Sequence, residues 1–86
     1  MYYVYILQSK KTNNWYTGAT SDLQKRFQQH NAGGSKATKK DKPWKLIYYE
    51  ACHNKHDMRA REKYLKSGMG KRFVRNRLKF FFAEGF

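Results

Sequence analysis

The sequence predicts an α+β fold in which a three-stranded, mainly antiparallel sheet is flanked by about three helices. Three runs of aromatic, β-branched and aliphatic residues have the length and composition of strands, at 2–7, 15–20 and 44–49. Capping residues and apolar side chains at helical spacing lie between and after these runs. At 86 residues the chain is near the lower limit for a single core, so residues 1–86 are predicted to form one domain.

The first two strands are predicted to form an antiparallel hairpin. Residues 10–14 between them are polar and include two asparagines, which tolerate the left-handed backbone of tight turns. This pairing predicts that the hydroxyl groups of Tyr5 and Tyr16 lie close together.

A helix is predicted over 22–31, because Ser21 and Gln24 have the spacing of a capping box. Its inward face mixes apolar side chains with cationic or titratable ones. The four residues on that face are Leu23, Arg26, Phe27 and His30.

Two later helices are predicted over 55–67 and 70–82. Asn54 caps the first of them and Gly68 ends it, and Glu62 falls among apolar neighbours on its inward side. The segment 31–43 is rich in glycine and lysine and is predicted to be a mobile surface loop. Such a loop can wrap a phosphate backbone, or it can be a solvated connection without a role.

The charge of the chain indicates an anionic partner. Nineteen Lys and Arg against six Asp and Glu give a net charge of +13, which favours nucleic acid as the partner. Solubility alone and acidic lipid are the alternatives, but 17% aromatic residues indicate a packed core, and no segment has the apolar face of a membrane-surface helix. The single cysteine, Cys52, fits a reducing compartment, so we expect a cytoplasmic protein without membrane association.

The scarcity of carboxylates limits any metal site to one ion. Glu50 and Glu62 are the candidate ligands, and Glu62 is favoured because its helix presents it from an apolar stripe. One carboxylate, water and substrate phosphate suit Mg²⁺ or Mn²⁺. The alternative for Glu62 is an ion pair with Arg59 or Lys66. A zinc site at Cys52, His53 and His56 is a weaker alternative, because no second ligand pair exists.

The remaining candidates suit phosphodiester hydrolysis. Arg26 carries a permanent charge on a planar fork that matches phosphate oxygens, and Tyr5 or Tyr16 could orient or deprotonate the attacking water. The structural alternative for each tyrosine is a place in the core, where aromatic residues of central strands usually lie.

These residues together resemble the GIY-YIG nuclease superfamily. The resemblance rests on Tyr3-Val4-Tyr5, then Tyr16-Thr17-Gly18, then Arg26 and His30 on one helix and Glu62 on a later one. It is strongest to the small stand-alone bacterial members, and more distant to the nuclease domains of excision-repair and homing endonucleases. It implies a three-stranded antiparallel sheet flanked by helices, one-metal hydrolysis of DNA, and a place in DNA repair or recombination.

The resemblance also assigns roles residue by residue. Tyr5 matches the last tyrosine of the first tripeptide and Tyr16 the first of the second, Arg26 the phosphate-binding arginine, and Glu62 the metal-binding glutamate. His30 matches a histidine found in part of the superfamily, and we expect it to act on phosphate together with Arg26. Gly18 matches a glycine that lets the backbone come close, and Asn76 an asparagine that many members carry. The sequence departs from the pattern at Tyr3, where the name has glycine, at Thr17, where it has isoleucine, and at Ala19, where repair nucleases often have lysine.

We therefore expect a metal-dependent endonuclease that acts on nucleic acid, with DNA favoured and a protein partner as a possible source of specificity. The alternative is a basic DNA-binding or RNA-binding module that keeps the fold without cutting. Besides the five catalytic positions, the residues predicted to contact nucleic acid are Gly18, Lys25, Lys36, Lys39, Lys40, Lys66, Lys71, Arg72 and Asn76.

Overall fold

The computed structural model of the protein describes residues 1–85 and contains one three-stranded antiparallel sheet. Its strands are β1 (Tyr2–Ser9), β2 (Trp15–Thr20) and β3 (Trp44–Cys52), arranged in the order β2-β1-β3. The predicted α+β class and hairpin are confirmed, and two of the strands extend further than the apolar runs suggest. Both β2 and β3 are therefore edge strands, and β1 lies between them.

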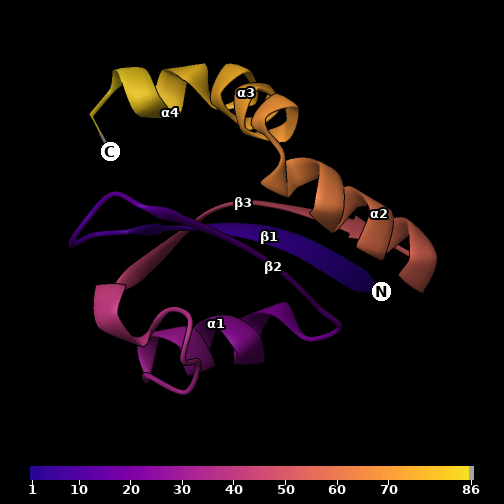
Figure 1. Ribbon diagram of the computed structural model, residues 1–86, viewed down its shortest axis with the longest axis horizontal. Coiled ribbons are helices and arrows are strands. Elements are labelled where there is room, and N and C mark those ends of the chain that lie inside the picture. The colour runs from indigo at the N-terminus through magenta and orange to yellow at the C-terminus, as the bar shows by residue number, and fades with distance from the viewer. Residues whose placement is uncertain (86) are drawn as a thin grey trace.

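Four α-helices cover the sheet, namely α1 (Leu23–Asn31), α2 (Lys55–Lys66), α3 (Gly68–Arg77) and α4 (Lys79–Ala83). A 3-10 turn, η1 (Lys39–Asp41), lies in the segment before β3. Figure 1 shows α1 and this segment on one side of the sheet and α2, α3 and α4 on the other. Within residues 1–85, no helix combines the length and the apolar character needed to cross a lipid bilayer.

The central strand, β1, is buried on both faces of the sheet, and its successive side chains pack alternately on the two faces. Val4 and Ile6 pack with residues of α2 and α3, whereas Tyr5 and Leu7 pack on the side of α1. All four are at most 1% exposed. A strand places successive side chains on opposite faces, so the run 4–7 supplies two separate clusters.

Two features of the helices differ from the sequence prediction. Asp22, and not Ser21, caps α1, because the Asp22 side chain accepts a hydrogen bond from the Lys25 amide at 3.1 Å. The predicted third helix is two helices that meet at Leu78, whose backbone is not helical. Ser67 ends α2 and also caps α3, so Gly68 begins a helix where it was expected to end one.

The segment 31–43 is anchored at several points, although the sequence predicted a mobile loop. Asn31 clamps the start of β3 by accepting from the Trp44 amide at 2.6 Å and donating to the Trp44 carbonyl at 3.1 Å. The Trp44 indole donates to the Thr38 carbonyl at 2.8 Å, and Ser9 donates to the Asp41 carbonyl at 2.6 Å. The lysines of this segment are thus carried by a backbone that is tied to β1 and β3.

Candidate active site

A buried chain of polar side chains runs from β1 through α1 to the segment 31–43. The Tyr5 hydroxyl lies 2.8 Å from Nε2 of His30, and Nδ1 of His30 lies 2.7 Å from the Thr38 hydroxyl. Tyr5 is 1% exposed, and His30 and Thr38 are fully buried. Each buried polar group has a partner, as a stable interior requires.

The direction of these hydrogen bonds follows from the last member of the chain. We infer that the Thr38 hydroxyl donates its single hydrogen to the Ser35 carbonyl, 3.5 Å away, and that its oxygen accepts from Nδ1 of His30, 2.7 Å away. A neutral imidazole that carries its hydrogen on Nδ1 has a bare Nε2. The Tyr5 hydroxyl therefore donates to His30 and keeps its own lone pairs for other donors.

Burial and neighbouring charge set the protonation states of this chain. Burial, together with the nearby Arg26 guanidinium, lowers the pKa of His30 to about 4, so the imidazole is neutral at pH 7. Burial raises the pKa of the Tyr5 hydroxyl, and the adjoining Arg26 opposes that rise. His30 was predicted to contact phosphate directly. The structure instead places it beneath Tyr5, away from solvent.

Gly18 makes this arrangement possible. It lies opposite Tyr5 in the hairpin register, and a β-carbon there would overlap the Tyr5 hydroxyl and lie 2.6 Å from Cζ of that ring. The space that a side chain would fill is therefore occupied by Tyr5 and not by nucleic acid, which corrects the predicted role of this glycine. The predicted proximity of the two tyrosines is confirmed, since the ring centroids of Tyr5 and Tyr16 are 6.5 Å apart.

Tyr16 and Arg26 are the half-buried members of the group. The Tyr16 ring packs beside His30, with centroids 5.1 Å apart, and beside Trp44, and it lines a surface cavity described below. Arg26 donates to the Gln29 side chain at 3.1 Å, an exposed contact that leaves most of its guanidinium hydrogens for other acceptors. No carboxylate among residues 1–85 pairs with Arg26. Its charge is therefore available to an anion.

Glu62 lies on α2, on the opposite face of the sheet from α1, and its charge acts on Tyr5. Its negative charge contributes to the raised pKa of Tyr5, so the carboxylate is within electrostatic range of that hydroxyl. The Glu62 side chain is 16% exposed and forms ion pairs with Arg59 at 3.7 Å and Lys66 at 3.2 Å. Both ion pairs considered as alternatives in the sequence are therefore present. Both partners are largely exposed, and surface pairs of this kind are weak.

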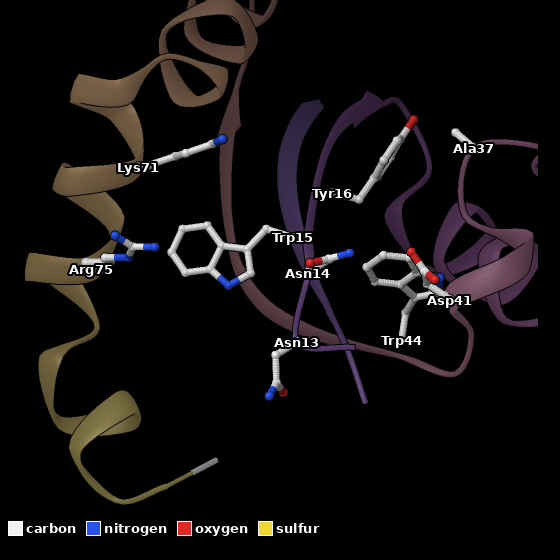
Figure 2. Close-up of a pocket in the computed structure, with 9 residues that line it drawn as sticks. All are labelled: Asn13, Asn14, Trp15, Tyr16, Ala37, Asp41, Trp44, Lys71 and Arg75. Atoms are coloured by element: carbon white, nitrogen blue, oxygen red, sulfur yellow. The ribbon is translucent and has the colours of Figure 1, made fainter. Parts of the chain in front are cut away.

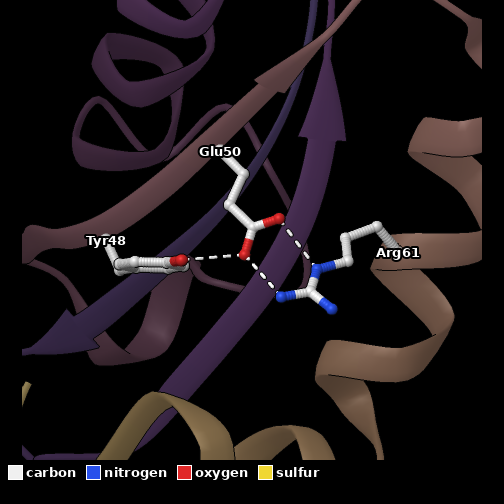
Figure 3. Close-up of polar contacts among 3 residues, drawn as sticks. All are labelled: Tyr48, Glu50 and Arg61. Atoms are coloured by element: carbon white, nitrogen blue, oxygen red, sulfur yellow. Dashed lines mark hydrogen bonds and ion pairs between the residues drawn. The ribbon is translucent and has the colours of Figure 1, made fainter. Parts of the chain in front are cut away.

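The other candidate carboxylate, Glu50, is hydrogen-bonded to neighbouring side chains. Arg61 of α2 donates two hydrogen bonds to it, at 2.8 and 2.9 Å, and the Tyr48 hydroxyl donates a third at 2.8 Å (Figure 3). The Arg61 contact lowers the pKa of Glu50. The Arg61 guanidinium also lies over the rings of Tyr64 and Phe73, so this group ties β3 to α2 and α3.

No cluster of metal-binding side chains surrounds either carboxylate. Among residues 1–85, no three His, Cys, Asp or Glu side chains are grouped closely enough to hold an ion. The zinc alternative at Cys52, His53 and His56 thus lacks a set of ligands, and the Cys52 thiol donates to the Asn54 carbonyl. A metal at Glu62 would rely on that carboxylate, water and substrate, as the sequence analysis anticipated.

The cationic residues predicted to contact nucleic acid lie on several surfaces. Lys25 is exposed on α1, and Lys36, Lys39 and Lys40 are exposed in the segment 31–43. On the other side of the sheet, Lys66 pairs with Glu62, and α3 exposes three more predicted contacts, Lys71, Arg72 and Asn76. Of the five positions predicted to be catalytic, Tyr5, Tyr16, Arg26 and His30 lie together, and Glu62 lies across the sheet within electrostatic range of Tyr5.

Sequence reasoning missed Thr38, Trp15 and Arg75. Thr38 lies in a stretch that reads as polar loop, and no local pattern indicates that its hydroxyl is buried against His30. Trp15 was assigned only to a strand, and Arg75 only to an exposed helix face. Their meeting, with the guanidinium carbon 5.4 Å from the indole centroid, depends on how α3 crosses the sheet.

The chain is similar to known proteins over nearly its whole length. Residues 1–80 match the family described as the GIY-YIG catalytic domain. A UPF0213 protein of Clostridium perfringens is 46% identical over 77% of this chain and 71% of its own length. The UPF0213 protein YazA of Bacillus subtilis is 39% identical over 76% of this chain and 66% of its own. Among solved structures, the UPF0213 protein BH0048 of Bacillus halodurans, determined by solution NMR, is 35% identical, with a TM-score of 0.53 over 86% of this chain and 82% of that one.

Proposed function

Because the chain belongs to the GIY-YIG family, whose domain is of nuclease type, we propose that it is a metal-dependent endonuclease that hydrolyses phosphodiester bonds, with DNA as the favoured substrate. The observation that carries the proposal is that Tyr5, Tyr16 and Arg26 lie around a buried, neutral His30, with the Glu62 carboxylate within electrostatic range of Tyr5. Groups of these kinds are what phosphodiester hydrolysis requires: an oriented water, a cation for the phosphate oxygens and a ligand for a metal.

Tyr16 is the tyrosine proposed to contact the attacking water, because its ring is half-buried and lines a surface cavity. Tyr5 lies deeper and directs its hydrogen at His30, so its oxygen offers lone pairs toward Arg26. His30 holds Tyr5 in that orientation by accepting its hydrogen bond at Nε2. Arg26 binds a non-bridging oxygen of the phosphate through its planar fork, where negative charge grows during the reaction.

The residues present fit one Mg²⁺ or Mn²⁺ ion at Glu62. The Glu62 side chain is 16% exposed, and its two ion-pair partners, Arg59 and Lys66, are exposed surface side chains. Mg²⁺ keeps much of its hydration shell and is often held by a single carboxylate and substrate phosphate. When bound, such an ion would supply charge stabilisation at the phosphate and at the leaving oxygen.

The test compares Glu62→Gln with the wild-type protein on labelled single-stranded, duplex and branched DNA and on RNA. Wild type should cut at least one of these with Mg²⁺ and none with EDTA. Glu62→Gln should abolish cleavage and leave binding unchanged or slightly tighter, since it removes the metal ligand and one negative charge near the phosphate. Glu84→Gln is the matched control, because it removes an exposed carboxylate at the end of α4. Wild-type cleavage by Glu62→Gln would overturn the proposed site.

A further inference from the structure

A cavity of about 410 Å³ opens on edge strand β2, next to the proposed site. Figure 2 shows α3 on one side of it, with Lys71 and Arg75, and the segment 31–43 on the other, with Asp41. Trp15 and Tyr16 of β2 lie between these two walls. We call this cavity the β2 groove. Because Tyr16 lines it, whatever occupies the groove lies beside the phosphate to be cut.

The two walls of the groove carry opposite charge. Lys71 and Arg75 are one helical turn apart on α3, both are exposed, and neither forms an ion pair with a carboxylate among residues 1–85. Two such cations are suited to successive phosphates of a nucleic-acid backbone. Asp41 on the facing wall repels phosphate. A strand in the groove is therefore expected to run its backbone along α3 and to turn its bases toward β2.

Trp15 provides a rigid aromatic surface at the position where those bases would lie. Its indole stacks on Phe82 of α4, with ring centroids 5.5 Å apart and planes 19° apart. The guanidinium carbon of Arg75 also lies over this indole, 5.4 Å from the ring centroid. A base can replace the guanidinium on the ring, and the guanidinium then remains close enough to pair with the adjoining phosphate. Asn14, in the same groove, offers an amide to the edge of a base.

An aromatic surface flanked by cations favours unpaired bases over the paired bases of a duplex. In a duplex the bases stack on one another and expose only their edges, so an aromatic side chain between cations gains little from them. An unpaired base presents a whole face to an indole, whatever its identity. We propose that the β2 groove binds unpaired nucleotides of a single-stranded segment next to the cut phosphate, with a base on Trp15 and the backbone on Lys71 and Arg75. The inference rests on the proposed nuclease function and narrows its substrate class.

The groove can be tested without any cleavage, because Trp15 is itself a fluorescent probe. The full chain in EDTA is titrated with a single-stranded oligothymidine and with a matched duplex. Trp44, the other tryptophan, also lines the groove but is 3% exposed, and its own contribution is measured in Trp15→Phe. Single strand should quench the fluorescence and duplex should not, and the quenching should be absent from Trp15→Phe. Quenching by the duplex to the same extent would overturn the inference.

Exposed cations of the groove give a second test that does not disturb the core. Lys71→Ala and Arg75→Ala together should weaken single-strand binding about ten-fold or more relative to wild type and should affect duplex binding much less. Lys55→Ala with Lys63→Ala, two exposed lysines of α2, is the control of equal charge. Equal losses in the two double variants would overturn the groove. Single-strand quenching without cleavage of any substrate would support the groove and contradict the nuclease. If the wild type cuts nucleic acid but the double variant of Lys71 and Arg75 binds single strand as tightly as the wild type, the nuclease function would be supported and the proposed role of the β2 groove contradicted.

Discussion

At the scale of single residues, Thr38 determines which nitrogen of a buried imidazole carries the hydrogen. Its hydroxyl accepts from Nδ1 of His30, and this leaves Nε2 to receive the hydrogen of Tyr5. Among residues 1–85 no buried side-chain nitrogen or oxygen lacks a hydrogen-bond partner, so removal of one member must disturb the others. A residue of the segment 31–43 is thus connected through His30 to Tyr5 of the proposed site.

Thr38→Val should reverse the tautomer of His30. Without an acceptor at Nδ1 the hydrogen moves to Nε2, Tyr5 must then accept it, and the Tyr5 hydroxyl loses its preferred orientation. We expect cleavage to fall by about ten-fold or more, with a loss of roughly 1–3 kcal/mol in stability. The decisive measurement is the pair of ¹⁵N chemical shifts of the His30 ring. Thr38→Ser keeps the hydroxyl and should keep the wild-type shifts. Unchanged shifts in Thr38→Val would show that Thr38 does not set the tautomer.

His30 should also give the protein an acid-sensitive stability. Its pKa in the folded state is about 4, against an ordinary value of 6.5, so the folded state binds the proton less readily than the unfolded chain does. The stabilisation is complete above pH 6.5 and is lost as the pH falls toward 4. Between pH 7 and pH 5 the free energy of unfolding should fall by about 2 kcal/mol.

Urea titrations at several pH values measure this effect, with His30→Gln as the comparison. Glu50, whose pKa is lowered, also loses stabilisation on acidification, but only at a pH near or below its ordinary value of 4.5. The interval from pH 7 to pH 5 therefore isolates the imidazole. His30→Gln is expected to have lower stability and a flatter response in that interval. A variant that retains the wild-type slope would assign the pH dependence to another group.

At the scale of elements, the angle between α2 and α3 depends on a glycine. A β-carbon at Gly70 would overlap the Tyr64 carbonyl oxygen and lie 2.5 Å from Cα of Leu65, both of them backbone atoms of α2. The two helices can therefore approach only where one of them lacks a side chain. Since Glu62 is on α2 and Lys71 and Arg75 are on α3, this contact sets how closely the proposed metal ligand approaches the β2 groove.

Gly70→Ala should destabilise the protein by roughly 1–3 kcal/mol, because the helices must separate to admit a methyl group. Gly68→Ala is its matched control in the same helix, since nothing lies within 4 Å of the added carbon. That substitution should be neutral or stabilising by up to about 1 kcal/mol. Thermal unfolding of the two variants measures the difference. Equal melting temperatures would mean that the helices do not need this close approach.

Some of these elements could be predicted from the sequence and others could not. The length and composition of three apolar runs located all three strands, and helical spacing placed Arg26 and His30 on the inward face of α1. The break at Leu78 was not predictable, because the apolar residues on either side continue the same helical spacing. Ser67 was missed as a double cap because α2 and α3 turn there about a contact that only tertiary packing reveals. No local pattern indicated that Thr38 is buried, since the side chains that enclose it, His30 and Trp44, come from α1 and β3.

At the scale of the whole molecule, the charge of +13 is distributed over both sides of the sheet. We expect binding to nucleic acid to weaken steeply with salt, because each phosphate contact adds a slope of about 0.7 to 0.9 in log K against log salt. Alanine at Lys36, Lys39 and Lys40 should lower that slope if the anchored segment 31–43 contacts the backbone. Binding measured between roughly 50 and 200 mM salt provides the slopes. A flat response in the wild type would mean that the charge is not the binding surface.

The two-sided burial of β1 has a consequence for how this protein can change over generations. Val4 and Ile6 hold the sheet to α2 and α3, whereas Tyr5 faces α1 and the polar chain to Thr38. Apolar exchanges on the first face alter the strength of the fold and do not touch the hydrogen-bonded side chains on the second. Val4 and Ile6 can therefore be exchanged for other apolar residues that pack equally well, whereas Tyr5 between them must keep its hydroxyl group. A lineage can therefore adapt its heat tolerance and its chemistry along one strand by separate, alternating positions.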